Sequence, residues 1–189
     1  MKIVVFGDSI STHIEMKNMT EDLLAQAHIS GEVICCAVAG EDTNAAMKRL
    51  ADVVAQKADY YYIFFGANDA AVHRKISPQQ FFKNITTFIT ALGAQKTSIL
   101  TPSYVNEVAM MNSQKMLGRS NTRLIDYVES VKAAGEKTGA NVLNLNALMH
   151  QQPNPDELIV SDGVHFTTKG YKLVTSLIAQ DIISREQNN

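Results

Sequence analysis

The sequence has few cysteines. Cys35 and Cys36 are the only two among 189 residues, and they are adjacent in the strand-like run 33–38. Neighbouring side chains on a strand point to opposite faces of a sheet, which argues against a disulfide between them and fits a reducing compartment. The run offers no electropositive, partly exposed setting for a reactive thiol. We therefore expect two buried, unreactive thiols.

Long apolar runs are also absent. No segment approaches the about 20 apolar residues that span a bilayer. The chain passes from Lys2 straight into a short strand, without the apolar stretch of a signal peptide. These absences predict a protein with no membrane span and a cytoplasmic location.

Neither sign of charge is in excess. The chain has 17 Lys and Arg against 19 Asp and Glu, a net charge of −2, and its basic residues are scattered. We therefore expect no nucleic-acid partner and no anionic membrane partner. Hydrophobic residues make up 46% and charged residues 19%, as in globular proteins. The length suits one hydrophobic core and is short for two, so we expect a single domain over residues 1–189.

Short apolar runs alternate with longer segments in which apolar residues recur three and four apart. The short runs predict strands at residues 3–6, 33–38, 60–65, 97–101 and 141–145. The longer segments predict helices at residues 15–28, 43–56, 78–92 and 121–138, and a last helix from 167 or 168 to 183. Segments 103–120 and 151–155 are expected to be the least regular. The pattern predicts an α/β fold, a three-layer α/β/α sandwich around a five-stranded parallel sheet.

Polar motifs follow the predicted strands. In chain order they are Gly7-Asp8-Ser9, Gly40, Gly66-Ala67-Asn68-Asp69 and, before the last helix, Asp162-Gly163-Val164-His165. Ligands of parallel α/β sheets bind outside the carboxyl ends of the strands. We therefore expect all four motifs at one rim of the sheet.

Three of these residues have the chemistry of a serine nucleophile. A serine hydroxyl needs a base to take its proton, and the base needs a carboxylate to orient it. Ser9, His165 and Asp162 supply these groups, and Gly163 gives the intervening turn its freedom. Acyl transfer also needs donors for the carbonyl oxygen, which the backbone N–H groups of Ser9 and Gly40 and the amide of Asn68 can provide.

Each motif alone also has a simpler interpretation. Gly-Asp-Ser after a strand is commonly a capped helix start, and Asp-Gly-x-His is commonly a turn. We expect Asp8 to be a hydrogen-bonding turn residue and Asp69 to have a structural role, capping the following loop and helping to aim Asn68. No role is assigned to the remaining histidines, which are His13, His28, His73 and His150.

Taken together, the four motifs resemble in order and spacing the sequence blocks of the SGNH hydrolases, also called GDSL-type esterases and lipases. The resemblance spans essentially the whole chain and is greatest to the small single-domain bacterial esterases. It implies a flavodoxin-like sandwich and a serine hydrolase mechanism without a cofactor or metal. In that mechanism Ser9 is the nucleophile, His165 the base and then the acid, and Asp162 its orienter. Ser9, Gly40 and Asn68 form the oxyanion hole.

Two departures from the family pattern flank these blocks. Cys35 and Ala37 stand where family members often carry Asn-x-Gly, which predicts a different support for the Gly40 loop. Ser11-Thr12-His13 stands where many relatives have Thr-x-Gly, which predicts a different entrance beside Ser9.

The predicted activity is hydrolysis of a small carboxylic ester with a short acyl chain. A thioesterase, a lysophospholipase or a carbohydrate O-deacetylase would use the same triad. Residues 104–117 contain three Met and one Tyr and form either an adaptable apolar wall for the substrate or an ordinary packed segment.

Two other classes of site would use some of the same residues. A flavodoxin-like module for FMN or phosphate would explain residues 7–12 but not the other blocks. A metal-dependent hydrolase would use Asp8, Asp69, Asp162 and His165, but no paired motif such as His-x-x-x-His occurs.

Overall fold

A computed structural model describes residues 1–187. At its centre is a five-stranded sheet in the order β2-β1-β3-β4-β5, with all neighbouring strands parallel. The strands are β1 (Lys2–Gly7), β2 (Glu32–Ala37), β3 (Tyr60–Phe64), β4 (Thr97–Leu100) and β5 (Asn141–Leu143). The predicted α/β class and parallel sheet are confirmed.

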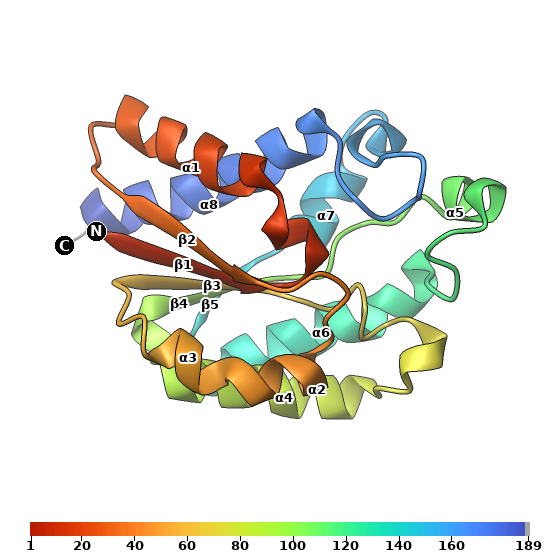
Figure 1. The fold of residues 1–189 in the computed structure, drawn as a ribbon, viewed down its shortest axis with the longest axis horizontal. Coiled ribbons are helices and arrows are strands. Elements are labelled where there is room, and N and C mark those ends of the chain that lie inside the picture. The colour runs from red at the N-terminus through yellow and green to blue at the C-terminus, as the bar shows by residue number, and fades with distance from the viewer. Residues whose placement is uncertain (188–189) are drawn as a thin grey trace.

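Helices cover both faces of the sheet (Figure 1). One face carries α1 (Ile14–Gln26) and α8 (Thr168–Gln187), with α7 (Leu145–His150) beside them. The other carries α2 (Thr43–Ala46), α3 (Leu50–Val54), α4 (Pro78–Leu92) and α6 (Asn121–Thr138), and α5 (Glu107–Ser113) lies beyond the carboxyl ends of the strands. None of the helices within residues 1–187 has both the length and the apolar character to cross a bilayer.

The two faces of the sheet bury separate cores because strand side chains alternate. Val4 and Phe6 pack toward α4 and α6, whereas Ile3 and Val5 pack toward α1 and α8. These residues are fully buried, which explains why the strands read as continuous apolar runs.

Two long helices begin and end where their capping residues predict. The Ser77 hydroxyl accepts from the backbone N–H of Gln80 at the start of α4, where Pro78 occupies the first turn. Gly139 ends α6 with a left-handed φ of 77°.

The helix predicted over residues 43–56 is interrupted. A 3₁₀ turn at Met47–Arg49 separates α2 from α3. Arg49 leaves helical geometry, and its guanidinium donates to the carbonyls of Gly7 and Cys36 at the ends of β1 and β2. A tertiary contact therefore overrides the local periodicity.

Short helices account for two other differences. The predicted strand 141–145 ends at Leu143, because the Asn144 side chain accepts from the N–H of Ala147 and starts α7. Segment 103–120 contains α5, which Asn106 caps in the same way through Ala109. Residues 151–154 form the expected turn region, followed by a 3₁₀ helix at Pro155–Leu158.

The two cysteines are free, and they pack on opposite faces of β2 as predicted. They are only partly buried, because β2 is an edge strand of the sheet. Burial raises the pKa of Cys35 to about 11 and also raises the pKa of Cys36, so both thiols are poor sources of thiolate.

Candidate active site

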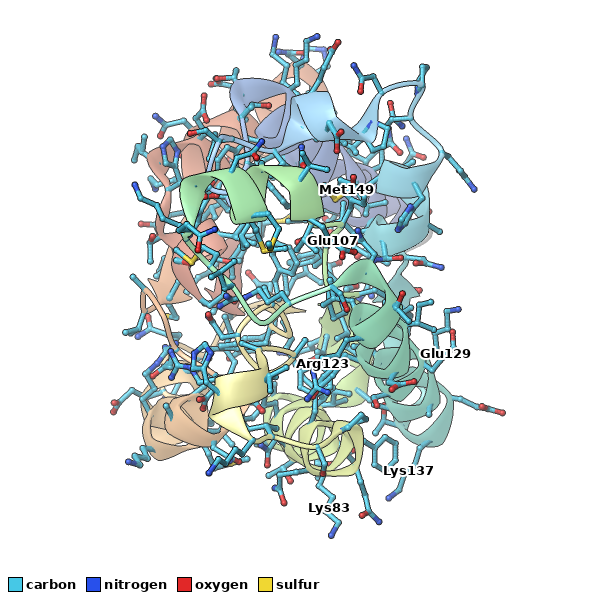
Figure 2. All side chains as sticks on the ribbon, turned by 90° about the vertical axis from the view of Figure 1, so that its right-hand side faces the viewer. Lys83, Glu107, Arg123, Glu129, Lys137 and Met149 are labelled. Carbon is cyan, nitrogen blue, oxygen red and sulfur yellow. The ribbon has the colours of Figure 1, made fainter. Side chains whose placement is uncertain are left out.

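The four predicted motifs meet at the carboxyl ends of the strands, the side that faces the viewer in Figure 2. The connection after β1 runs over one face of the sheet and the connection after β3 over the other, so a crevice opens between these neighbouring strands. An open cavity of about 520 Å³ lies there, and Ser9, Gly40, Asn68 and His165 are among its lining residues.

Ser9, His165 and Asp162 form a continuous chain of contacts. Ser9 Oγ lies 2.8 Å from Nε2 of His165, and Nδ1 of the same ring lies 2.6 Å from Asp162 Oδ2. The other carboxylate oxygen of Asp162 accepts from the backbone N–H groups of Val164 and His165 at 2.9 and 3.0 Å. The structure brings together the three residues predicted from the sequence.

The turn between Asp162 and His165 requires glycine. Gly163 has a φ of +86°, and a Cβ there would lie 2.5 Å from the carbonyl oxygen of Asn106. Asn106 also donates its backbone N–H to the carbonyl of Gly163 at 2.9 Å, which fixes the turn against the start of α5.

Asp162 is in a setting that favours its ionised form. Burial acts to raise its pKa, but the hydrogen bonds from the His165 ring and from two backbone N–H groups outweigh burial and lower the pKa. The ionised carboxylate can therefore accept a hydrogen bond from Nδ1–H of His165.

The Asn68 amide is held at both ends. Its Nδ2 donates to the carbonyl of Glu41 at 2.9 Å and to Asp8 Oδ2 at 3.3 Å, and its Oδ1 accepts from Arg119 Nη2 at 2.9 Å. The long contact to Asp8 is the weaker of the two that Nδ2 makes. The N–H that bonds to the Glu41 carbonyl is thus firmly anchored, and the N–H that faces Asp8 can also donate to a ligand.

Two arginines support the Gly40 loop. Arg74 Nη2 donates to the carbonyl of Gly40 at 2.8 Å, while Gly40 itself has a left-handed φ of +75°. Arg49, which already holds the ends of β1 and β2, also forms an ion pair with Glu41. Neither arginine was predictable from the sequence, because its partners lie far away in the chain.

Arg119 is a third residue that the sequence analysis missed. It lies in the segment expected to be irregular, yet its side chain is buried and reaches the site. Its Nε donates to the carbonyl of Ala67 at 2.6 Å and its Nη1 to that of Met116 at 2.7 Å, besides the bond to Asn68. His73, to which the sequence analysis assigned no role, also lines the cavity.

Two further carboxyls near Asn68, those of Asp8 and Asp69, are buried. Asp8 accepts from the N–H of Ile10 at 3.1 Å, as a turn residue should, and burial raises its pKa to about 6. Asp69 accepts from the backbone N–H and the hydroxyl of Thr43, which ties the loop after β3 to the start of α2. Asn68 is aimed by Arg119, Glu41 and Asp8 rather than by Asp69, contrary to that part of the prediction.

Asp69→Asn is expected to flatten the pH dependence of stability. Burial raises the pKa of Asp69 from 3.8 to about 7, so folding takes up a proton between these values and the free energy of unfolding falls as pH rises through them. An amide does not titrate. From about pH 4 to pH 8 the wild type should lose stability relative to the variant, by on the order of a few kcal/mol. Urea unfolding of both proteins at the two pH values measures this, and parallel stability curves would contradict it.

The four residues that a metal site would use, Asp8, Asp69, Asp162 and His165, contact different partners and do not converge on one point. Asp162 and His165 contact each other, Asp8 faces Asn68, and Asp69 faces Thr43. Over the described part of the chain, residues 1–187, no three His, Cys, Asp or Glu side chains gather as a metal centre.

Comparison with known proteins places the chain in a family. Residues 5–173 match the model of the GDSL-like lipase/acylhydrolase family. The chain is 31% identical to a lipase/acylhydrolase from Enterococcus faecalis, whose crystal structure superposes with a TM-score of 0.91 over 97% of this chain and 96% of that one. It is 25% identical to a GDSL esterase/lipase of Arabidopsis thaliana over 92% of this chain and 81% of the relative.

A further relative carries a substrate in its name. The chain is 26% identical to the isoamyl acetate-hydrolyzing esterase 1 homolog of Bos taurus, over 60% of this chain and 51% of the relative. The resemblance seen in the four motifs is confirmed, and the chain belongs to the GDSL-like lipase/acylhydrolase family.

Proposed function

We propose that the protein hydrolyses small carboxylic esters through an acyl-enzyme on Ser9. The observation that carries this proposal is the two-sided engagement of His165, 2.8 Å from Ser9 Oγ and 2.6 Å from Asp162 Oδ2. If Gly7-Asp8-Ser9 were only a capped helix start and Asp162 to His165 only a turn, neither would require His165 to contact both Ser9 and Asp162. It is the arrangement by which a base takes the proton of a serine hydroxyl.

In the proposed reaction, Ser9 Oγ attacks the ester carbonyl as its proton passes to Nε2 of His165. Asp162 accepts a hydrogen bond from Nδ1–H of the resulting imidazolium and stabilises its charge. The tetrahedral intermediate then collapses, and the alcohol leaves with the proton from Nε2. Water next gives a proton to Nε2 and attacks the acyl-enzyme. The second tetrahedral intermediate collapses to release the acid, and Nε2 returns the proton to Ser9 Oγ.

Negative charge on the carbonyl oxygen would be stabilised by the backbone N–H groups of Ser9 and Gly40 and by Asn68 Nδ2. All three residues line the same cavity. The N–H of Asn68 that faces Asp8 at 3.3 Å is the one we assign to the oxyanion, because the bond to the Glu41 carbonyl holds the amide in place meanwhile.

The cavity suits a small substrate with an apolar group. Its volume of about 520 Å³ is in the lower part of the range for small-molecule sites. Of the segment 104–117, Met116 and Leu117 line the cavity, whereas Val105 and Met110 are buried in the core. Met116 and Leu117 are 37% and 40% exposed, so they are free to contact an acyl or alcohol chain. The name of the bovine relative, an isoamyl acetate esterase, fits a substrate of this kind.

A substrate panel tests this assignment. Among p-nitrophenyl esters we expect kcat/KM to be highest for short acyl chains and to fall by at least about tenfold for long ones, which exceed the wall formed by Met116 and Leu117. Thioesters and O-acetylated sugars in the same panel address the thioesterase and deacetylase alternatives. A steady rise in kcat/KM into the long-chain range, or a preference for thioesters or acetylated sugars, would contradict the proposal.

A further inference from the structure

Arg119 is a buried cation without an ion pair. Its exposed fraction is 8%, and no carboxylate within residues 1–187 forms an ion pair with it. Asp8 and Asp162 act on it only through space. Buried arginines are usually paired, because removing a charge from water is energetically costly. Packing alone therefore does not explain this residue.

The three hydrogen bonds of Arg119 have one common effect. Nε binds the carbonyl of Ala67 and Nη2 binds Oδ1 of Asn68, so the guanidinium bridges the backbone and the side chain of one loop. Rotating the Asn68 amide by half a turn would place its NH₂ group against the guanidinium, donor against donor. Its oxygen would then face the Glu41 carbonyl and the Asp8 carboxyl, acceptor against acceptor.

We propose that Arg119 is a positioning residue for the oxyanion hole, which locks the Asn68 amide with its N–H side toward the Ser9 cavity. The inference rests on the proposed function. A charged donor on Oδ1 also draws electron density from the amide and makes its N–H groups stronger donors. Arg119 thus acts through Asn68 to stabilise the charge that develops on the substrate.

The same side chain anchors the apolar wall. Nη1 of Arg119 holds the carbonyl of Met116, a residue with a left-handed φ of 54°. This conformation is strained for a non-glycine residue, and the hydrogen bond helps to offset the strain. One guanidinium therefore sets both the donor for the oxyanion and part of the wall that meets the substrate.

Arg123 offers a matched control. It is the next arginine along the chain, is labelled in Figure 2, and donates its Nε to the carbonyl of Ala70 at 2.6 Å. Like Arg119, it donates a hydrogen bond to the backbone after β3. Its guanidinium contacts Ala70 and Tyr127 rather than Asn68. The variant Arg123→Met therefore measures how much kcat changes when an arginine that contacts this loop, but not Asn68, is lost.

The experiment is a double-mutant cycle on ester hydrolysis. We expect Asn68→Ala to lower kcat by about 10²- to 10³-fold, as for loss of one oxyanion donor. Arg119→Met should lower kcat by about 10- to 100-fold, with loss of the Met116 anchor raising KM rather than lowering kcat, whereas Arg123→Met should leave kcat within about twofold. Adding Arg119→Met to Asn68→Ala should cause little further loss, because the group that Arg119 positions is already gone.

Each contrary outcome has a separate meaning. If Arg119→Met leaves kcat unchanged, or lowers it as much in the Asn68→Ala background as alone, the inference about Arg119 is wrong. If Asn68→Ala itself leaves kcat unchanged, the proposed oxyanion hole is wrong instead. Should Arg119→Met fail to fold, the same cycle with Arg119→Lys decides, because an ammonium keeps the charge but cannot bridge Ala67 and Asn68 as the planar fork does.

Discussion

Ser9→Ala is expected to lower kcat for a short-chain p-nitrophenyl ester by about 10⁵- to 10⁶-fold, the loss seen when a serine hydrolase loses its nucleophile. The substitution removes the atom that lies 2.8 Å from His165 Nε2 and would form the bond to the acyl group. Binding and the oxyanion donors remain, so a small residual rate above that of water is expected. Steady-state kinetics, with thermal unfolding as a check on the fold, measures the effect.

Ser11→Ala is the matched control, since Ser11 lies on the same 3₁₀ turn, Ser9–Thr12. The side chain is buried, and its hydroxyl has no hydrogen-bond partner among the described residues. Removing it should leave kcat within about twofold, because no satisfied polar contact is lost. Comparable kcat values for Ser9→Ala and the wild type would contradict the assignment of the nucleophile.

Asp162→Asn should lower kcat by about 10⁴-fold while the fold is retained. The amide oxygen can still accept from the N–H groups of Val164 and His165, as Oδ1 of the carboxylate does. The amide nitrogen would then face Nδ1 of His165 and donate to it. That contact favours the tautomer with its proton on Nε2, which leaves the ring unable to accept the proton of Ser9.

Asp156→Asn provides the comparison for this second substitution. Asp156 accepts from the hydroxyl of Tyr104 at 2.6 Å and makes no contact with the His165 ring. Its amide variant should keep kcat within about twofold, as for a surface polar substitution. If kcat for Asp162→Asn falls by less than about tenfold, Asp162 does not orient the base in the way proposed here.

The location of the site was predictable from the sequence because of how parallel sheets are built. All strands of such a sheet end at one rim, so polar residues placed just after strands must meet there. Ser9, Gly40 and Asn68 follow this rule, whereas His165 comes after α7 and a 3₁₀ helix and was predicted from its spacing to Asp162 and from the family pattern.

The supporting arginines were not predictable in the same way. Arg49, Arg74 and Arg119 bind backbone carbonyls in distant segments, and a carbonyl has no sequence signature. Only the three-dimensional approach of the loops reveals these contacts. The break between α2 and α3 has the same origin, because Arg49 turns out of the helix to reach the strand ends.

Short helices and edge positions also escaped the sequence analysis. The helices α5 and α7 have 7 and 6 residues, too few for apolar periodicity to be visible, and side-chain caps start them. The partial exposure of Cys35 follows from the edge position of β2, which depends on strand order rather than on local composition.

The most direct test is to locate the covalent adduct formed with a fluorophosphonate, which reacts with an activated serine as an ester does. Intact-protein mass spectrometry followed by peptide mapping should find one phosphonyl group per chain, attached to Ser9, and none in Ser9→Ala. Labelling of Ser9→Ala to the wild-type extent, or an adduct on any residue other than Ser9, would contradict the proposed mechanism.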